Sequence, residues 1–193
     1  MYPEKLICEN ERLLLIDHFV RLGPDDRYLR FGYPVQDEQI KEYVNTSFGT
    51  ANNQWFGLFD KGLIIGAIHV SLLDSEQAEM GLSVDSKCRS AGIGQSLFNR
   101  GLVWARARGT NQIYMQCLSE NKVMQHIAKK NGMMVATICK TEKEAKLEFP
   151  IADVTAPFSD MAFDRITAID KMYKTQQTFY LNMFKIYTKG KAK

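Results

Sequence analysis

The stretch around two glycines near the middle of the chain constrains the fold most. Residues 78–85 have the alternating pattern of a strand, Arg89 lies in the loop that follows, and Gly92 and Gly94 open an amphipathic helical run. The first N–H groups of a helix have no internal acceptor, and the helix dipole favours an anion there. Glycine lets a ligand approach the backbone, and arginine can bind two oxygens at once. This order of residues predicts a pyrophosphate-binding site.

Other glycine-rich phosphate motifs fit this stretch less well. Residues 92–97 lack the third small residue of the dinucleotide-binding fingerprint. No lysine followed by serine or threonine closes a loop of the nucleoside-triphosphatase kind. A glycine turn that binds nothing stays open as the alternative.

The spacing Arg-x-x-Gly-x-Gly, after a strand that ends in Leu-x-Val, resembles the acyl-CoA site of the GNAT acyltransferase family. The resemblance implies that the strand binds the pantetheine arm and helps to polarise the thioester, while the loop and the helix start bind the pyrophosphate. Asn121 matches an asparagine that the family places near the pantetheine, although a plain helix N-cap would look the same. The cofactor-binding residues implied in this way are Leu82, Ser83, Val84, Arg89, Ser90, Ala91, Gly92, Ile93, Gly94, Gln95, Ser96 and Asn121.

The order of the predicted elements is also similar to the GNAT fold, an α/β fold with a mixed, mostly antiparallel sheet flanked by helices. The family's opening strand can only be residues 5–8, so we expect it to be reduced or missing. The predicted helices are residues 11–22, 24–31, 37–44, 92–108 and 121–130. The predicted strands are residues 54–59, 63–73, 77–84, 113–118, 134–140 and 145–149.

A chain of 193 residues can bury one substantial core together with an appended element. We expect a GNAT acyltransferase domain at 1–149, a connector at 150–157, a long amphipathic C-terminal helix at 158–187 and a basic tail at 188–193. The helix carries an apolar stripe that needs a partner surface, either on its own domain or on a second copy in a homodimer. Residues 21–31 resemble the opening of the acyltransferase modules of bacterial protein acetyltransferases.

Composition excludes several other classes of protein. A net charge of +3 forces no broad basic face, which argues against nucleic-acid binding. The first residues lack the apolar core of a signal peptide, and no run approaches membrane-spanning length. The four cysteines have no zinc, redox or disulfide spacing, so we predict no metal site and free thiols in a reducing cytoplasm.

The residues that could perform acid–base chemistry are few. Many family members have a tyrosine seven residues after the asparagine as the acid for the leaving thiolate, but this chain has Ala128 there. Gln116 stands where some relatives have a glutamate, and an amide cannot act as a base. Glu79 on the third strand is the best remaining carboxylate, with a solvent-facing strand residue as its alternative. His69 could reach a cleft, whereas we expect His18 to be structural.

These residues favour an N-acetyltransferase that moves an acetyl or short acyl group from acetyl-CoA or a related acyl-CoA to a primary amine. The amine would attack directly, with Glu79 or an ordered water as base. The missing tyrosine motivates an alternative, a regulatory protein that binds acyl-CoA without turnover. The acceptor could be a small-molecule amine or a protein amine, and the sequence does not choose between them.

Overall fold

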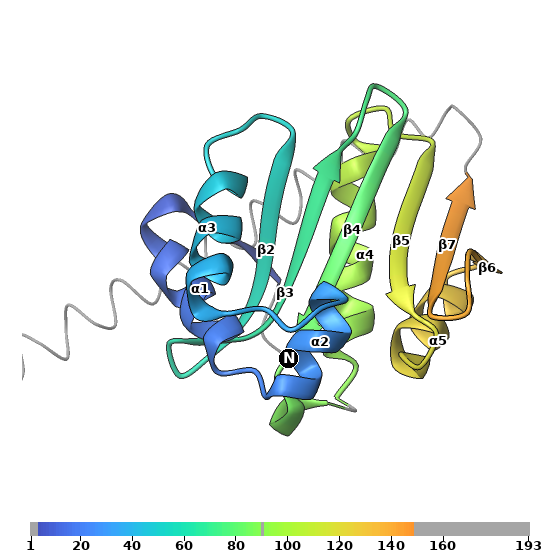
Figure 1. The fold of residues 1–193 in the computed structure, drawn as a ribbon. Helices are drawn as coiled ribbons and strands as arrows, with labels where there is room; N and C mark the ends of the chain where they lie inside the picture. Colours follow the sequence, from blue (N-terminus) through green and yellow to red (C-terminus); the bar gives the residue numbers. More distant parts are fainter. Residues whose placement is uncertain (1–3, 90, 149–193) are drawn as a thin grey trace, which may run out of the picture.

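The computed structural model describes residues 4–89 and 91–148 (Figure 1). Within these ranges the chain forms one seven-stranded sheet in the order β1-β2-β3-β4-β5-β7-β6. The strands are β1 (Lys5–Leu6), β2 (Asn53–Asp60), β3 (Leu63–Leu72), β4 (Gln77–Val84), β5 (Gln112–Leu118), β6 (Met134–Thr137) and β7 (Glu142–Glu148). The helices are α1 (Arg12–Val20), α2 (Pro24–Phe31), α3 (Asp37–Ser47), α4 (Ile93–Arg106) and α5 (Lys122–Lys130), with the 3-10 turns η1 (Glu9–Glu11) and η2 (Ser86–Cys88).

The fold confirms the predicted mixed sheet flanked by helices, with differences at the ends of elements. The predicted opening strand exists but has two residues, and α3 continues past the predicted end to Ser47. Strand β4 has the predicted bounds. The predicted connector, C-terminal helix and basic tail, together with Ser90, lie outside the described residues.

The hairpin between β2 and β3 follows from two turn residues. Lys61 and Gly62 both have positive φ angles, 48° and 83°, as the tight turn of a two-residue hairpin requires. Strand β3 pairs antiparallel with β2 on one edge and with β4 on the other. The register between β3 and β4 fixes which side chains of β4 face each side of the sheet.

Helices cover both faces of the sheet (Figure 1), and an apolar cluster lies between each helical layer and the sheet. Helices α1 and α3 pack on one face around Phe19 and Trp55. Helices α4 and α5 pack on the other face around Leu97 and Met80. Because alternate residues of β4 point to opposite faces, Ala78, Met80 and Leu82 enter the second cluster and Glu79, Gly81 and Ser83 face the α1–α3 side.

The sheet opens between β4 and β5. These two strands run parallel and pair over three residues each, 77–79 with 112–114. Strand β4 then continues to Val84 and β5 to Leu118, and the described residues show no further pairing between them. On the edge of β4 that faces β5, backbone N–H and C=O groups from Met80 onwards therefore have no strand partner and can hydrogen-bond to a ligand.

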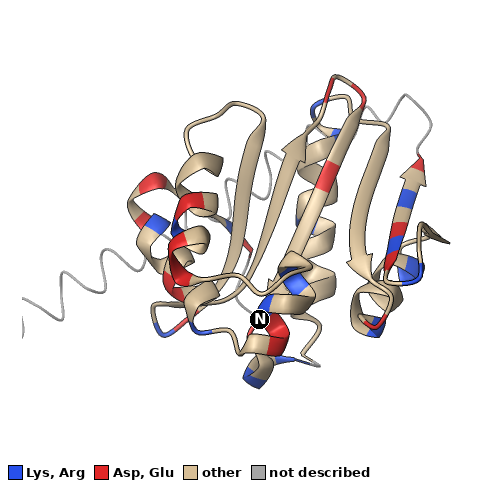
Figure 2. Cartoon of the chain, in the orientation of Figure 1, with Lys and Arg blue, Asp and Glu red and all other residues tan. Residues whose placement is uncertain are grey.

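Charged residues of both signs lie along α1–α3 and β7 (Figure 2). No helix in the described part of the chain is long and apolar enough to cross a membrane. Within the same residues, no group of three or more His, Cys, Asp or Glu side chains is placed to hold a metal ion.

Candidate active site

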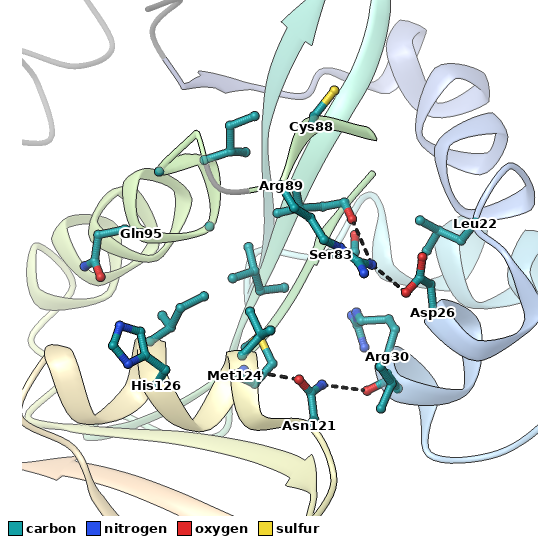
Figure 3. A pocket seen from close by; sticks show the side chains of 18 of the residues that line it. Leu22, Asp26, Arg30, Ser83, Cys88, Arg89, Gln95, Asn121, Met124 and His126 are labelled. Carbon is teal, nitrogen blue, oxygen red and sulfur yellow. Dashed lines mark hydrogen bonds and ion pairs between the residues drawn. The ribbon is translucent and has the colours of Figure 1, made fainter. Parts of the chain in front are cut away.

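A cavity of about 350 Å³ lies beside the β4 edge, between the start of α4, helix α5 and helix α2 (Figure 3). We call it the first cavity. Ala91 and Ser96 are not among the residues that line it, and Ser90 is not described. The predicted cofactor-binding residues that line it are Leu82, Ser83, Val84, Arg89, Gly92, Ile93, Gly94, Gln95 and Asn121.

The start of α4 has the geometry of an anion site. Gly92 precedes the helix with φ 77°, in the left-handed region that favours glycine. The first helical hydrogen bond at this end runs from the Ser96 amide to the Gly92 carbonyl, at 3.0 Å. The amides of the first turn therefore lie before this bond and have no acceptor inside the helix.

Arg89 lines the first cavity but already has a partner there. Its Nη2 donates to Oδ1 of Asp26 on α2 at 2.5 Å, and lies 3.5 Å from the Val84 carbonyl oxygen (Figure 3). The Arg89 side chain is 43% exposed and that of Asp26 is 16% exposed. The predicted phosphate-binding arginine is thus ion-paired across the cavity to a carboxylate that the sequence analysis did not consider.

Two amide side chains brace the α5 side of the first cavity. Asn121 caps α5, because its Oδ1 accepts from the Met124 amide at 3.1 Å. Its Nδ2 donates to the Leu29 carbonyl of α2 at 3.3 Å, so the same residue joins α5 to α2. Of the two roles that the sequence left open for Asn121, the cap is confirmed. Gln95 exchanges hydrogen bonds with Asn131 after α5.

A second cavity, of about 440 Å³, lies on the α1–α3 side of the sheet. It is lined by residues of β3, β4 and β5, by α2 and by α3. The residues that line both cavities are Leu29, Arg30, Leu82, Asn121 and Met124. The two cavities therefore meet where β4 and β5 part.

The predicted base lies on the second cavity. Glu79 is exposed on β4, on the strand face that Gly81 shares, and it pairs across the sheet with Ser71 and Tyr114. Gln116 is exposed and lines the same cavity. Ala128 has no ionisable group, so its position supplies no acid. Its side chain is 1% exposed in the apolar cluster under α5 and lines neither cavity.

The second cavity contains a polar chain of which the sequence pointed only to His69, as a residue that could reach a cleft. Nη2 of Arg30 donates to the Tyr43 hydroxyl at 2.8 Å, and that oxygen lies 3.0 Å from Nδ1 of His69. His69 stacks on Trp55 at 4.3 Å between ring centroids. Burial, assisted by the positive charge of Arg30, lowers the pKa of His69 to about 3, so this ring is neutral near pH 7.

The signal that could have revealed this chain is a glycine inside a strand. Gly81 lies in the middle of β4, and a Cβ atom added there would be 2.5 Å from Nη2 of Arg30. Glycine within a strand often marks the close approach of another group. The residue that approaches comes from α2, which lies far away in sequence.

The other histidines have simpler roles. His18 is fully buried, its Nδ1 is 3.0 Å from the Ile64 carbonyl oxygen, and its Nε2 is 2.8 Å from the Ser83 hydroxyl. Since the carbonyl can only accept, Nδ1 donates and Nε2 accepts from Ser83. Burial lowers the pKa of His18 to about 4. His18 thus ties α1 to the sheet, as expected of a structural residue.

A split sheet with a helix N-terminus at its opening is the arrangement of an acetyltransferase fold. The chain belongs to the Acetyltransferase (GNAT) family, whose sequence model matches residues 21–133. Members of this family are acetyltransferases. No protein of the curated set matches the chain significantly.

Solved structures of the same fold include several bacterial acetyltransferases. The GNAT domain of S. lividans PAT superposes with a TM-score of 0.67 at 14% identity, covering 76% of this chain and 89% of that domain. The ribosomal-protein-alanine N-acetyltransferase of Brucella melitensis gives 0.60 at 12%, covering 76% and 99%. The Campylobacter jejuni N-acetyltransferase PseH, in complex with acetyl coenzyme A, gives 0.55 at 15%, covering 78% and 100%. At these identities the likeness shows the fold alone.

Proposed function

We propose that the protein is an N-acetyltransferase that transfers an acetyl or short acyl group from acyl-CoA to a primary amine by direct attack. One observation carries this proposal. Two cavities that share five lining residues meet at the edge where β4 separates from β5. Such a junction lets a thioester enter from one side and an amine from the other, and holds them together for reaction.

The first cavity has the chemistry that coenzyme A requires. Free amides at the start of α4 and the guanidinium of Arg89 suit a diphosphate. Leu82, Val84 and Met124 give the middle of the cavity an apolar lining for the pantetheine arm. Bound there, acyl-CoA would supply an activated acyl group. The PseH complex with acetyl coenzyme A supports this assignment for a protein of the same fold.

The residues of this chain would then act on the amine. Glu79, at the second cavity, would accept the proton of the attacking nitrogen, directly or through a water molecule. Unpaired backbone N–H groups on the β4 edge would polarise the thioester carbonyl. The second cavity would hold the acceptor, as a small molecule or as the end of a protein side chain.

The proposal is tested by measuring release of free CoA thiol from acetyl-CoA over a panel of amines, with binding of CoA measured separately by calorimetry. Glu79→Gln should lower kcat about 100-fold and leave the CoA affinity unchanged. Glu42→Gln, on the exposed side of α3, is the matched control and should change neither quantity.

Two outcomes would contradict the proposal. If the wild-type protein does not bind CoA, the glycine stretch is a turn that binds no ligand. Tight CoA binding with no thiol release for any amine would favour the alternative, a regulatory protein that binds acyl-CoA without turnover.

A further inference from the structure

The guanidinium of Arg30 lies where the two cavities meet. Arg30 is among the residues that line both. Its head group lies against the backbone of β4, because a Cβ on Gly81 would be 2.5 Å from Nη2 and 2.8 Å from Cζ. No other cation lines both cavities among the residues that the structure describes. A ligand that reaches the junction from either side therefore meets this charge.

Among the described residues, no carboxylate pairs with the Arg30 guanidinium, which is held by a hydroxyl and aromatic rings. Nη2 donates to the Tyr43 hydroxyl, and Cζ lies 5.0 Å from the ring centroid of Phe31, 5.5 Å from that of Tyr43 and 5.8 Å from that of Phe19. Within residues 4–89 and 91–148, Nε is buried with no hydrogen-bond partner and Nη1 donates to none. A partly buried cation that lacks an anionic partner within the described residues lowers stability, and binding of an anion at the junction would offset that cost.

We propose that Arg30 stabilises the CoA thiolate that leaves during acyl transfer, in place of the acid that is missing at Ala128; this rests on the function proposed above. In this step the amine nitrogen bonds to the acyl carbon with its lone pair. The carbon–sulfur bond breaks, and its electron pair stays on sulfur. The proton lost by nitrogen passes to Glu79, and the thiolate later takes a proton from solvent.

The chemistry of arginine decides how it would act. A guanidinium stays protonated at any pH at which the protein is folded, so Arg30 cannot serve as a general acid. It can lower the energy of a negative sulfur by charge and by N–H donation. The rings and the Tyr43 hydroxyl fix its position in advance, so little reorganisation is needed as the charge develops.

The test measures the pKa of the thiol of bound CoA, and it needs no acceptor. CoA carrying carbon-13 at the carbon bonded to sulfur is titrated on the protein by NMR, so that Cys88 and Cys117, which also line the cavities, do not contribute. A cation within about 4–6 Å should lower the thiol pKa by about 1 to 3 relative to free CoA. Arg30→Met should abolish the difference, and Arg30→Lys should keep part of it.

Controls separate the charge from its surroundings. Arg12→Met removes a half-buried arginine that pairs with Glu9 of η1 and lines neither cavity, and it should leave the thiol pKa as in the wild type. The other charged or titratable groups that line the two cavities are Asp26, Tyr33, Tyr43, His69, Glu79, Cys88, Arg89, Cys117, His126, Lys130 and Glu142. The His69 ring is neutral, because burial lowers its pKa to about 3. Glu79→Gln should lower the thiol pKa further, because it removes a negative charge.

Gly81→Ala offers a second route if Arg30→Met does not fold. It keeps the guanidinium but forces it to move, at small cost because the crowded atoms are the far end of a flexible side chain. The thiol pKa should then rise towards that of free CoA. If wild-type and Arg30→Met proteins bind CoA with the same thiol pKa, the inference is wrong and the proposed function stands. If the wild type does not bind CoA, both are wrong.

Discussion

The carboxylate of Asp26 and the guanidinium of Arg89 form an ion pair that bridges α2 and the loop before α4. Both side chains line the first cavity, so this pair occupies the end where a diphosphate is expected. An anion that binds there must share Arg89 with Asp26 and approach a like charge. Under the proposed function, Asp26 would therefore limit how strongly this site holds CoA, and in the structure it pairs with Arg89.

The first prediction concerns this pair. Arg89→Ala should weaken CoA binding, since it removes the cation that can bind two phosphate oxygens. Asp26→Asn should strengthen it about 2- to 5-fold, the equivalent of roughly 0.5–1 kcal/mol for a partly exposed charge pair. Calorimetry at low and high salt checks both, and the gain in Asp26→Asn should shrink as salt rises. Weaker binding by Asp26→Asn would show that the pair organises the site.

The second prediction separates backbone strain from ligand binding at the start of α4. Gly92 and Gly109 both have positive φ angles, 77° and 86°, at opposite ends of the helix. Alanine at either position should cost about 1 kcal/mol of unfolding free energy. Denaturant unfolding measures that cost, and calorimetry measures CoA affinity. Gly92→Ala should weaken CoA binding and Gly109→Ala should not; equal affinities would remove Gly92 from the site.

The third prediction divides the two hydrogen bonds of Asn121. Asn121→Ala should lose about 1 kcal/mol of stability with the cap of α5. Asn121→Asp keeps the oxygen that caps the helix but removes the Nδ2 donor to the Leu29 carbonyl. Its unfolding free energy should lie close to the wild type. If CoA affinity falls in Asn121→Asp while stability holds, the link between α5 and α2 shapes the first cavity. Unchanged affinity would limit Asn121 to capping.

The fourth prediction concerns acid stability. The pKa of His18 is about 4 in the folded protein and near 6.5 in the unfolded chain. Between these values the unfolded chain binds a proton that the folded protein does not, so stability falls as pH drops from about 6.5 to about 4. At pH 5 this one residue should cost roughly 2 kcal/mol relative to pH 7.

The comparison variant is His18→Gln, which cannot titrate in this range. Its unfolding free energy should start lower at pH 7 and then fall less between pH 7 and pH 5 than that of the wild type. Equal losses in the two proteins would mean that His18 is protonated in the folded state. His69, whose pKa burial lowers to about 3, should add a loss of the same sign.

Local sequence patterns predicted most of the elements, because each depends on residues that are near one another in the chain. The alternation in residues 77–84 gave the bounds of β4, and the glycines at 92 and 94 marked the start of α4. The two-residue hairpin at Lys61 and Gly62 follows from turn chemistry in the same way. The predicted third helix ended too early because tertiary packing, with Ser47 bonded to Trp55, extends it beyond the local signal.

The candidate site likewise has one part that local sequence patterns predicted and one part that depends on long-range contacts. Residues 82–84 and 89–96 were predicted to bind the cofactor from neighbouring motifs in the sequence. Nine of the twelve predicted cofactor residues line the first cavity. The partners that decide the chemistry come from distant segments. Asp26 meets Arg89 across 63 positions of sequence, and Arg30 meets Gly81 across 51 positions. The sequence pattern within either segment does not predict these long-range contacts.

The amino-acid order alone thus determined the strand, the loop and the helix start that can hold a diphosphate, since backbone geometry and unpaired amides are local properties. The tertiary structure determined which charged side chains lie beside the predicted diphosphate site. Helix α2 packs over the parted strands and carries Asp26 to the first cavity and Arg30 to the place where the two cavities meet. Charges interact through space rather than along the chain. The effect of Asp26 and Arg30 on the site therefore depends on where α2 packs, which only the tertiary structure shows.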